Sequence, residues 1–147
     1  LALRALRPET GSLAKRWRGM DGSADIIIMG GGMAGLSTAT ALTADGHSII
    51  VLDKGRGPGG RMAARRAEMG GETVSFDHGA QYFTARDPAF CAQVAAWEQA
   101  GVAARWPAAG EDAWVGTPGM NAPIRAMAES LDVRWGVRAE ALCREGS

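Results

Sequence analysis

The sequence predicts an α/β fold with a central parallel sheet. The prediction rests on a continuous apolar run over residues 25–29, apolar residues at helical spacing from Leu36, and a second apolar run over residues 48–53. Short runs rich in β-branched residues are typical of strands buried on both faces of a parallel sheet, so we expect the first strand to be central. Because short links join strand, helix and strand, a right-handed parallel crossover is expected.

The helix between these strands should pack one apolar face on the sheet. Leu36, Ala39 and Leu42 recur at helical spacing, and Gly46 follows where glycine commonly ends a helix. Residues 25–53 therefore form a predicted strand–helix–strand unit.

A short strand and a longer helix are predicted downstream. Residues 73–77 have the composition of a short strand, and residues 88–100 that of a helix. Asp87 can cap the first turn of this helix, Pro88 suits its first position, and Gly101 can end it. The apolar face of the helix would comprise Phe90, Val94 and Trp97.

Near the end of the sequence a further helix and strand are expected. Asn121 could cap the helix, and residues 133–137 alternate like a strand. The inward positions of the helix would be Ile124, Met127 and Leu131. Since the chain stops at Ser147, shortly after this strand, we expect it to be the N-terminal part of a longer protein.

The ends and the overall composition exclude several classes of protein. Sixteen basic residues balance 16 acidic residues, so no net field favours nucleic acid or an anionic membrane. Cys91 and Cys143 form no CxxC pair, which argues against a metal site or a disulfide framework and favours a cytoplasmic protein. Residues 1–24 are expected to be a disordered or mispredicted leader, with Met20 as the native start.

A glycine turn carries the main functional signal. Residues 30–35, GGGMAG, match the GxGxxG pattern directly after the first predicted strand. Gly30 allows the turn off the strand, Gly32 allows the approach of a pyrophosphate, and Gly35 allows close packing of the helix. Backbone N–H groups at the helix start, around Met33 and Ala34, would face the phosphates. Asp53 ends the second strand, where a carboxylate can accept hydrogen bonds from both ribose hydroxyls, so a Rossmann-like dinucleotide-binding fold is predicted.

FAD and NAD(P) both carry an ADP moiety, so the turn alone does not separate them. Lys54 and Arg56 could pair with the 2′-phosphate of NADP, although Asp53 would repel that phosphate; both could equally be solvated surface charges. Gly60 and Arg61 favour FAD, because they form a second close-approach turn whose guanidinium could reach the pyrophosphate.

Longer motifs resemble a known group of flavoproteins. Residues 30–42 (GGGMAGLSTATAL) and 49–66 (IIVLDKGRGPGGRMAARR) resemble the FAD-binding head of the amine-oxidase-like flavoproteins. Residues 76–90 (FDHGAQYFTARDPAF) and 114–131 (WVGTPGMNAPIRAMAESL) resemble the renalase-like bacterial flavin oxidoreductases. The resemblance covers residues 25 to about 145 and implies FAD lying across a parallel sheet, beneath a second, mostly antiparallel substrate domain. Residues 25–147 would be the FAD-binding domain with part of that covering region.

The resemblance also implies which residues contact FAD. The pyrophosphate would contact the glycine turn and Arg61, and the ribose would contact Asp53, with Lys54 nearby. The isoalloxazine ring would lie against Ala80 and Gln81, and the adenine would lie against Ala139. The full predicted set is Gly30, Gly32, Met33, Ala34, Gly35, Asp53, Lys54, Gly60, Arg61, Ala80, Gln81 and Ala139. Gln81 could instead be a loop glutamine bonded to the backbone. No catalytic residue is assigned, since His78, which follows an aspartate in a turn, is expected to be structural rather than a general base.

The implied reaction passes hydride from a small-molecule substrate to the flavin, with molecular oxygen as the expected acceptor. The resemblance offers a dihydronicotinamide nucleotide or an amine as substrate, and we favour the first. Two alternatives stay open: an NAD(P)-dependent dehydrogenase, and a non-catalytic nucleotide-binding fragment. No amine-binding aromatic cage is assigned to the tryptophans that could be mistaken for one, which are Trp97, Trp106, Trp114 and Trp135. Periodicity assigns Trp97 and Trp135 to ordinary packing instead.

Overall fold

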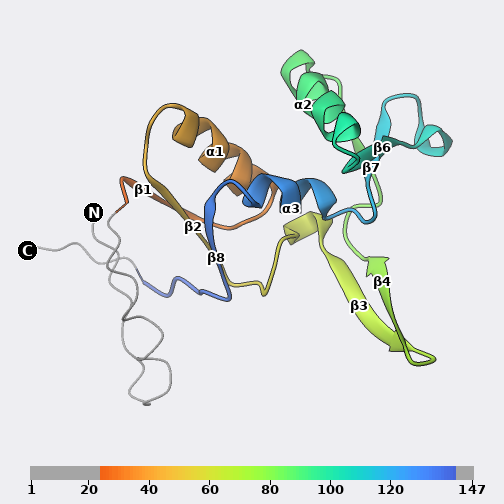
Figure 1. Cartoon of the computed structure of the whole chain (residues 1–147), viewed down its shortest axis with the longest axis horizontal. Helices are drawn as coiled ribbons and strands as arrows, with labels where there is room; N and C mark the ends of the chain where they lie inside the picture. The colour runs from red at the N-terminus through yellow and green to blue at the C-terminus, as the bar shows by residue number, and fades with distance from the viewer. Residues whose placement is uncertain (1–23, 142–147) are drawn as a thin grey trace, which may run out of the picture.

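The structure is a computed structural model, and it describes residues 24–141. One part of the molecule is a parallel sheet of three strands (Figure 1). Its strands are β1 (Ile26–Met29), β2 (Ile49–Asp53) and β8 (Asp132–Trp135), in the order β1-β2-β8. Both pairs are parallel. The predicted leader up to residue 23 and Cys143 lie outside the described residues.

The position of β1 differs from the sequence prediction. We expected a central strand, but within residues 24–141 β1 pairs with β2 alone and lies at the edge of the sheet. The core positions of β2, Ile50 to Leu52, are buried, whereas Ile26 to Ile28 are half-buried. The apolar run marked a strand correctly, but the order of strands depends on β8, which is distant in the sequence.

Helix α1 (Met33–Ala44) joins β1 to β2, as the periodicity predicted. Leu36 and Ala39 are fully buried against the sheet, and Gly46, at φ +91°, takes the left-handed conformation that ends the helix. Helix α3 (Ala122–Ala128) lies beside α1 in Figure 1 and shares its core through Ile124, which is also fully buried. This core fixes α1 on the sheet, and with it the turn that precedes α1.

A β-hairpin extends from the parallel sheet toward the lower right of Figure 1. It consists of β3 (Ala64–Met69) and β4 (Glu72–Asp77), paired antiparallel. The sequence predicted β4 but not β3. The hairpin is tied to the core at its base, because Asp77 accepts a 3.1 Å hydrogen bond from the backbone N–H of Met120.

A second, antiparallel sheet lies beneath helix α2 (Pro88–Gln99). Its strands, in order, are β5 (Phe83–Thr84), β7 (Ala113–Gly116) and β6 (Ala103–Arg105), and the 3-10 helix Pro107–Ala109 joins the last two. Asp87 accepts hydrogen bonds of 3.0 Å from the N–H groups of Ala89 and Phe90, which confirms the predicted cap. The predicted apolar face is also confirmed, since Val94 and Trp97 are buried in a core with Trp114.

Three details of the predicted elements are different in the structure. Asn121 occupies the cap position of α3, but its side chain makes no capping hydrogen bond, and Leu131 lies beyond the end of the helix. Strand β8 ends at Trp135, so Val137 lies outside it.

Among the helices within residues 24–141, none has both the length and the apolar character needed to cross a membrane.

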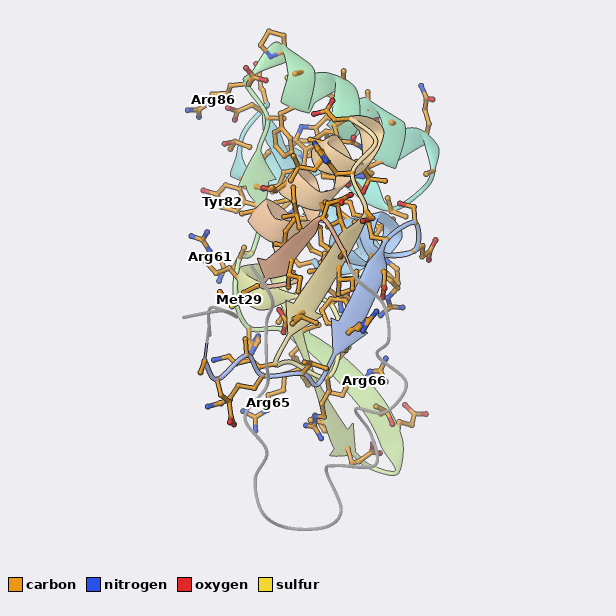
Figure 2. All side chains as sticks on the ribbon, turned by 90° about the vertical axis from the view of Figure 1, so that its left-hand side faces the viewer. Met29, Arg61, Arg65, Arg66, Tyr82 and Arg86 are labelled. Atoms are coloured by element: carbon orange, nitrogen blue, oxygen red, sulfur yellow. The ribbon has the colours of Figure 1, made fainter. Side chains whose placement is uncertain are left out.

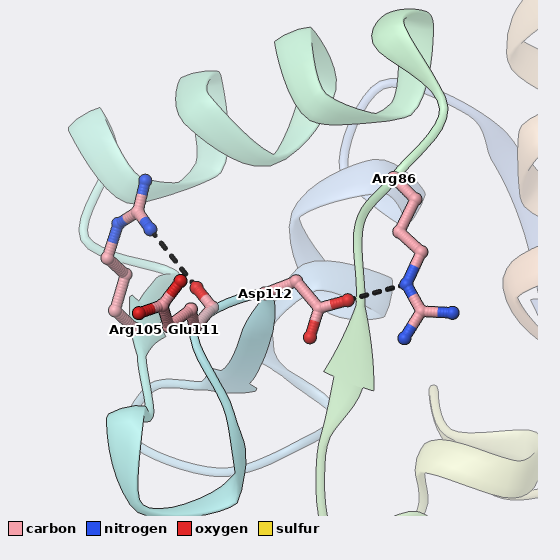
Figure 3. Close-up of polar contacts among 4 residues, drawn as sticks. All are labelled: Arg86, Arg105, Glu111 and Asp112. Carbon is pink, nitrogen blue, oxygen red and sulfur yellow. Dashed lines mark hydrogen bonds and ion pairs between the residues drawn. The ribbon is translucent and has the colours of Figure 1, made fainter.

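A polar cluster braces the loop before β7 (Figure 3). Nε of Arg86 donates a 2.5 Å hydrogen bond to Asp112, and Nη1 of Arg105 donates a 3.4 Å hydrogen bond to the carbonyl oxygen of Glu111. The bond from Arg86 lowers the pKa of the Asp112 carboxyl below its ordinary value of 3.8. Arg105 also lies over the Trp114 ring, 4.6 Å from its centroid. These contacts lie on the surface of the antiparallel sheet, and none of the four residues lines the two cavities near the parallel sheet.

Candidate dinucleotide-binding cleft

The glycine turn connects β1 to α1 at the carboxyl end of the parallel sheet. Gly30 has φ +113°, a conformation that side chains with a Cβ rarely adopt, and its N–H donates a 2.8 Å hydrogen bond to the carbonyl oxygen of Leu52. A Cβ on Gly35 would overlap the carbonyl oxygen of Gly30. The first and last glycines of the motif therefore have the mechanical roles that the sequence predicted, a turn off the strand and close packing of the helix.

The start of α1 provides backbone donors. Gly32 is the N-cap residue, and no side chain caps the helix there. The first helical hydrogen bond runs from the N–H of Leu36 to the carbonyl oxygen of Gly32, so the N–H groups of Met33, Ala34 and Gly35 have no partner within the helix. Together with the helix dipole, these groups make the turn favourable for an anion.

A second glycine turn faces the first. The 3-10 helix Gly60–Met62 begins at Gly60, whose φ is +55°, and a Cβ on Gly60 would lie 3.4 Å from the Cα of Gly32. A Cβ on the preceding Gly59 would lie 2.6 Å from the Cβ of Ala63. Small residues on both turns thus keep two stretches of backbone close together, and Arg61 extends from the second of them.

A cleft of about 430 Å³ lies between the two turns. Figure 2 shows Arg61 and Met29 on the same side of the molecule, and both line this cleft. Its lining also includes Gly30, Gly32, Met33, Ala34, Gly35, Asp53, Gly59, Gly60 and Met62. The structure therefore brings together all the residues of the predicted pyrophosphate site around one concave surface.

A second cavity of about 230 Å³ begins where the first ends, because Met29, Gly30 and Asp53 line both. Lys54 and Ala139, which the resemblance assigned to the ribose and adenine, line this second cavity. Its remaining lining residues are Leu52, Val137 and Arg138. The predicted adenosine contacts thus lie next to the predicted pyrophosphate contacts, in the order that an extended dinucleotide requires.

Asp53 lies at the junction of the two cavities. Its Oδ2 accepts a 2.6 Å hydrogen bond from the N–H of Gly31, and its Oδ1 accepts one of 2.6 Å from the N–H of Gly55. These bonds are to the chain itself, a role that the sequence did not predict. A carboxylate has about four lone-pair positions, so two bonds to the backbone leave capacity for ribose hydroxyls.

The two residues assigned to the isoalloxazine ring lie beyond Arg61. The N–H of Ala80 donates a 2.7 Å hydrogen bond to the carbonyl oxygen of Arg61, which places the segment at residues 79–81 directly beside the second turn. Gln81 is exposed, and neither residue lines the two cavities. His78 hydrogen-bonds through Nδ1 to the carbonyl oxygen of Ala63 at 2.8 Å, a contact of the structural kind that was expected.

Several lining residues were missed by the sequence interpretation. Met29 and Met62 carry no polar signal that would mark a nucleotide site. Arg138 had a detectable signal, since it is a basic residue next to Ala139, but nothing in the sequence indicated that it lines the same cavity as Lys54. No cluster of metal-ligating side chains occurs between residues 24 and 141.

Part of the chain is similar in sequence to known proteins. Residues 28–96 match the family described as the NAD(P)-binding Rossmann-like domain. The chain is 36% identical over 59 residues to Lysine-specific histone demethylase 1 homolog 3 of Oryza sativa subsp. indica, covering 40% of this chain and 7% of that protein.

Two further relatives are oxidases by name. "Putative flavin-containing monoamine oxidase AofH" of Mycobacterium tuberculosis strain H37Rv is 38% identical over 55 residues, which is 34% of this chain and 12% of that protein. The L-amino-acid oxidase of Daboia russelii is 46% identical over 41 residues, which is 28% of this chain and 8% of that protein.

This chain spans 7 to 12% of the length of these three relatives. The renalase-like resemblance stays a prediction. The strand, turn, helix and strand from β1 to β2 form a Rossmann-like unit, and residues 28–96 are similar to the NAD(P)-binding Rossmann-like domain. The chain also has partial similarity to amine oxidases and flavin-containing oxidases.

Proposed function

We propose that the cleft between the two glycine turns binds FAD, and that the chain is the FAD-binding part of an oxidoreductase. The observation that carries the proposal is the pairing of the GxGxxG turn with Gly60 and Arg61 across one cleft of about 430 Å³. The partial similarity to proteins named as a flavin-containing oxidase and an amino-acid oxidase supports FAD over NAD(P).

The residues of the cleft fit the ADP half of FAD. Gly32 and Gly60 leave the space that a Cβ would take, so a pyrophosphate can approach both backbones. Arg61 carries a positively charged fork of donors suited to phosphate oxygens. Asp53 at the end of β2 would accept hydrogen bonds from the ribose hydroxyls, and the neighbouring cavity at Lys54 and Ala139 would take the adenosine.

When bound, FAD would supply the capacity to accept a hydride, and the chain would supply binding and orientation. The segment at Ala80 and Gln81 would lie along the flavin end, since Ala80 is bonded to the carbonyl oxygen of Arg61. In this role the Ala80 backbone permits close approach and the Gln81 amide donates or accepts a hydrogen bond at the ring edge. Residues 25–147 would comprise this FAD-binding domain and, in the antiparallel strands from β3 onward, part of a substrate-covering region.

The substrate in this proposal is a dihydronicotinamide nucleotide or an amine, with molecular oxygen as the acceptor. The renalase-like motifs favour the first substrate class, and the names of the relatives favour the second. Both classes donate a hydride to flavin, so the assignment of the cofactor does not depend on which is correct.

The test is to purify the protein, record its visible spectrum and identify the extracted cofactor by chromatography. We expect flavin absorption bands and FAD in the extract, followed by oxygen consumption with dihydronicotinamide isomers or with amines. Protein that binds no flavin, including after incubation with FAD, would contradict the proposal.

An NAD(P)-dependent dehydrogenase is the second candidate, because Lys54 and Arg138 both line the cavity beside Asp53. Basic side chains at that position are suited to the 2′-phosphate of NADP. Comparison of 2′,5′-ADP with 5′-AMP, which lacks only the 2′-phosphate, tests for NADP: tighter binding of 2′,5′-ADP favours NADP, whereas equal or weaker binding contradicts NADP, and the extracted cofactor then separates FAD from NAD. A non-catalytic module would bind nucleotide and show no oxidation of either substrate class.

A further inference from the structure

Trp135 lies beside the glycine turn, although it belongs to a distant part of the sequence. It is the last residue of β8 and pairs in register with Asp53 at the end of β2. The two strands are parallel, so both residues lie at the carboxyl end of the sheet, where the cleft opens. Trp135 is half-buried and was assigned from the sequence to ordinary packing.

The indole of Trp135 occupies the space that a side chain at position 31 would need. A Cβ on Gly31 would lie 2.7 Å from Cζ3 and 2.8 Å from Cη2 of Trp135. It would also lie 3.3 Å from the Cβ of Asp53. Gly31 is a variable position of the GxGxxG pattern, and its φ is not positive, so backbone conformation does not require glycine there. An added methyl group there would have to displace the indole.

The hydrogen bond from Gly31 to Asp53 lies beside this contact. The N–H of Gly31 donates to Oδ2 of Asp53 at 2.6 Å, directly beside the indole. The segment after Trp135 is bonded to the loop that begins at Asp53. The N–H of Val137 donates a 2.9 Å hydrogen bond to the carbonyl oxygen of Asp53, and the N–H of Gly136 donates one of 2.6 Å to the carbonyl oxygen of Gly55. The Asp53 side chain is thus bonded to the glycine turn, and its backbone is bonded to the segment after β8.

We propose that Trp135 and Gly31 form a size-matched pair that positions the Asp53 carboxylate for the ribose of a bound nucleotide. Trp135 is a positioning residue that acts through Gly31 and Asp53. The inference rests on the proposed function in one respect, namely that a nucleotide ribose meets Asp53. The new element is that Trp135 and Gly31 determine the orientation of the Asp53 carboxylate. A bulkier residue at position 31 should therefore require a smaller one at position 135.

The test compares the binding of ADP and 2′-deoxy-ADP by calorimetry. In the unmodified chain, removal of the 2′-hydroxyl is expected to weaken binding about tenfold, the usual effect of losing a hydrogen bond to a charged group. Gly31→Ala should displace the turn and reduce this ratio toward one, as Asp53→Ala should. The double variant Gly31→Ala/Trp135→Leu should recover most of the discrimination, because leucine leaves room for the added methyl group.

Matched controls exclude general effects on folding. Gly57→Ala adds a methyl group in the loop after β2, where a Cβ would meet nothing within 4 Å, and Trp106→Leu removes an exposed indole. Neither control should change the ratio. Trp135→Phe provides a second variant if Gly31→Ala does not fold: beside the unchanged Gly31 the smaller ring leaves a gap, so the ratio should also fall toward one. Circular dichroism confirms that each variant is folded at the temperature of the titration.

The possible outcomes are distinct. An unchanged ratio in folded Gly31→Ala, or in Trp135→Phe where Gly31→Ala does not fold, would overturn the inference while leaving the nucleotide site intact. A double variant that binds no better than Gly31→Ala would also overturn it, since size matching is the claim. Failure of the unmodified chain to bind ADP would instead contradict the proposed function itself.

Discussion

The backbone N–H of Gly31 donates a 2.6 Å hydrogen bond to the Asp53 carboxylate, although helix α1 separates the two residues in the sequence. The bond ties the glycine turn to the end of β2. The residue expected to meet the ribose therefore also holds together the turn expected to meet the pyrophosphate. Loss of this carboxylate should affect both stability and binding.

Replacement of Asp53 tests this double role. Asp53→Ala leaves the N–H groups of Gly31 and Gly55 without their acceptor, so the free energy of unfolding should fall by about 2 kcal/mol. Asp53→Asn keeps one acceptor oxygen and should cost less. Urea unfolding followed by circular dichroism measures both, and equal stability of Asp53→Ala and the unmodified chain would refute the bracing role.

Close packing of α1 on β1 gives a second prediction. Gly35→Ala places a methyl group against the carbonyl oxygen of Gly30, and this overpacking should lower the free energy of unfolding by about 1–3 kcal/mol. Gly57→Ala is the control, since the space around Gly57 is open. We expect that control to be neutral or slightly stabilising, as measured by thermal unfolding of both variants in parallel.

Arg61 should act on the pyrophosphate and not on the nucleoside. Arg61→Ala is expected to weaken the binding of ADP about tenfold, as for a lost hydrogen bond to a charged group, and to leave the binding of adenosine unchanged. The effect should decrease with added salt. Arg65→Ala, on the neighbouring hairpin strand, lines neither cavity and serves as the control. Equal loss of affinity for ADP and adenosine would place Arg61 outside the pyrophosphate site.

The pH dependence of stability should include a contribution from Asp25. Hydrogen bonds from the Ser48 backbone N–H at 2.8 Å and the Ser48 hydroxyl at 2.9 Å lower the pKa of the Asp25 carboxyl below its ordinary value of 3.8. A carboxyl with a depressed pKa stabilises the fold above the unfolded-state value, and this stabilisation is lost as the pH falls through the folded-state value.

Asp25→Asn should therefore show a smaller loss of stability than the unmodified chain as the pH falls below about 4. Glu98→Gln, at an exposed position of α2, is the control and should retain the full loss. Acid unfolding curves followed by circular dichroism compare the three proteins. Identical curves for Asp25→Asn and the unmodified chain would show that the bonds to Ser48 carry no pH-dependent stability.

The sequence predicted the parts of the fold that depend on local signals. The glycines of the turn, the helical spacing in α1 and the cap at Asp87 each mark a structure within a few residues, and the structure contains all of them. Strand β3 was missed because Ala64–Met69 has neither apolar alternation nor a continuous apolar run. The edge position of β1 was also missed.

In the candidate site too, the sequence predicted the residues that carry a local motif and missed the long-range contacts. Residues carried by a motif, such as Gly32 and Arg61, line the predicted cleft. The contact between Gly31 and Trp135 joins β8 to the turn across more than half of the described chain, and no periodicity or spacing reports such a contact. Long-range pairing of strands creates it, so it could be found only in the folded structure.

The central claim is that the cleft at Gly32, Gly60 and Arg61 binds FAD. The most direct measurement is a titration of FAD with the protein, followed by the change in flavin fluorescence and repeated with ADP as competitor. We predict saturable binding of one FAD per chain, displaced by ADP and weakened about tenfold by Arg61→Ala. Absence of saturable FAD binding, or binding that ADP does not displace, would contradict the account.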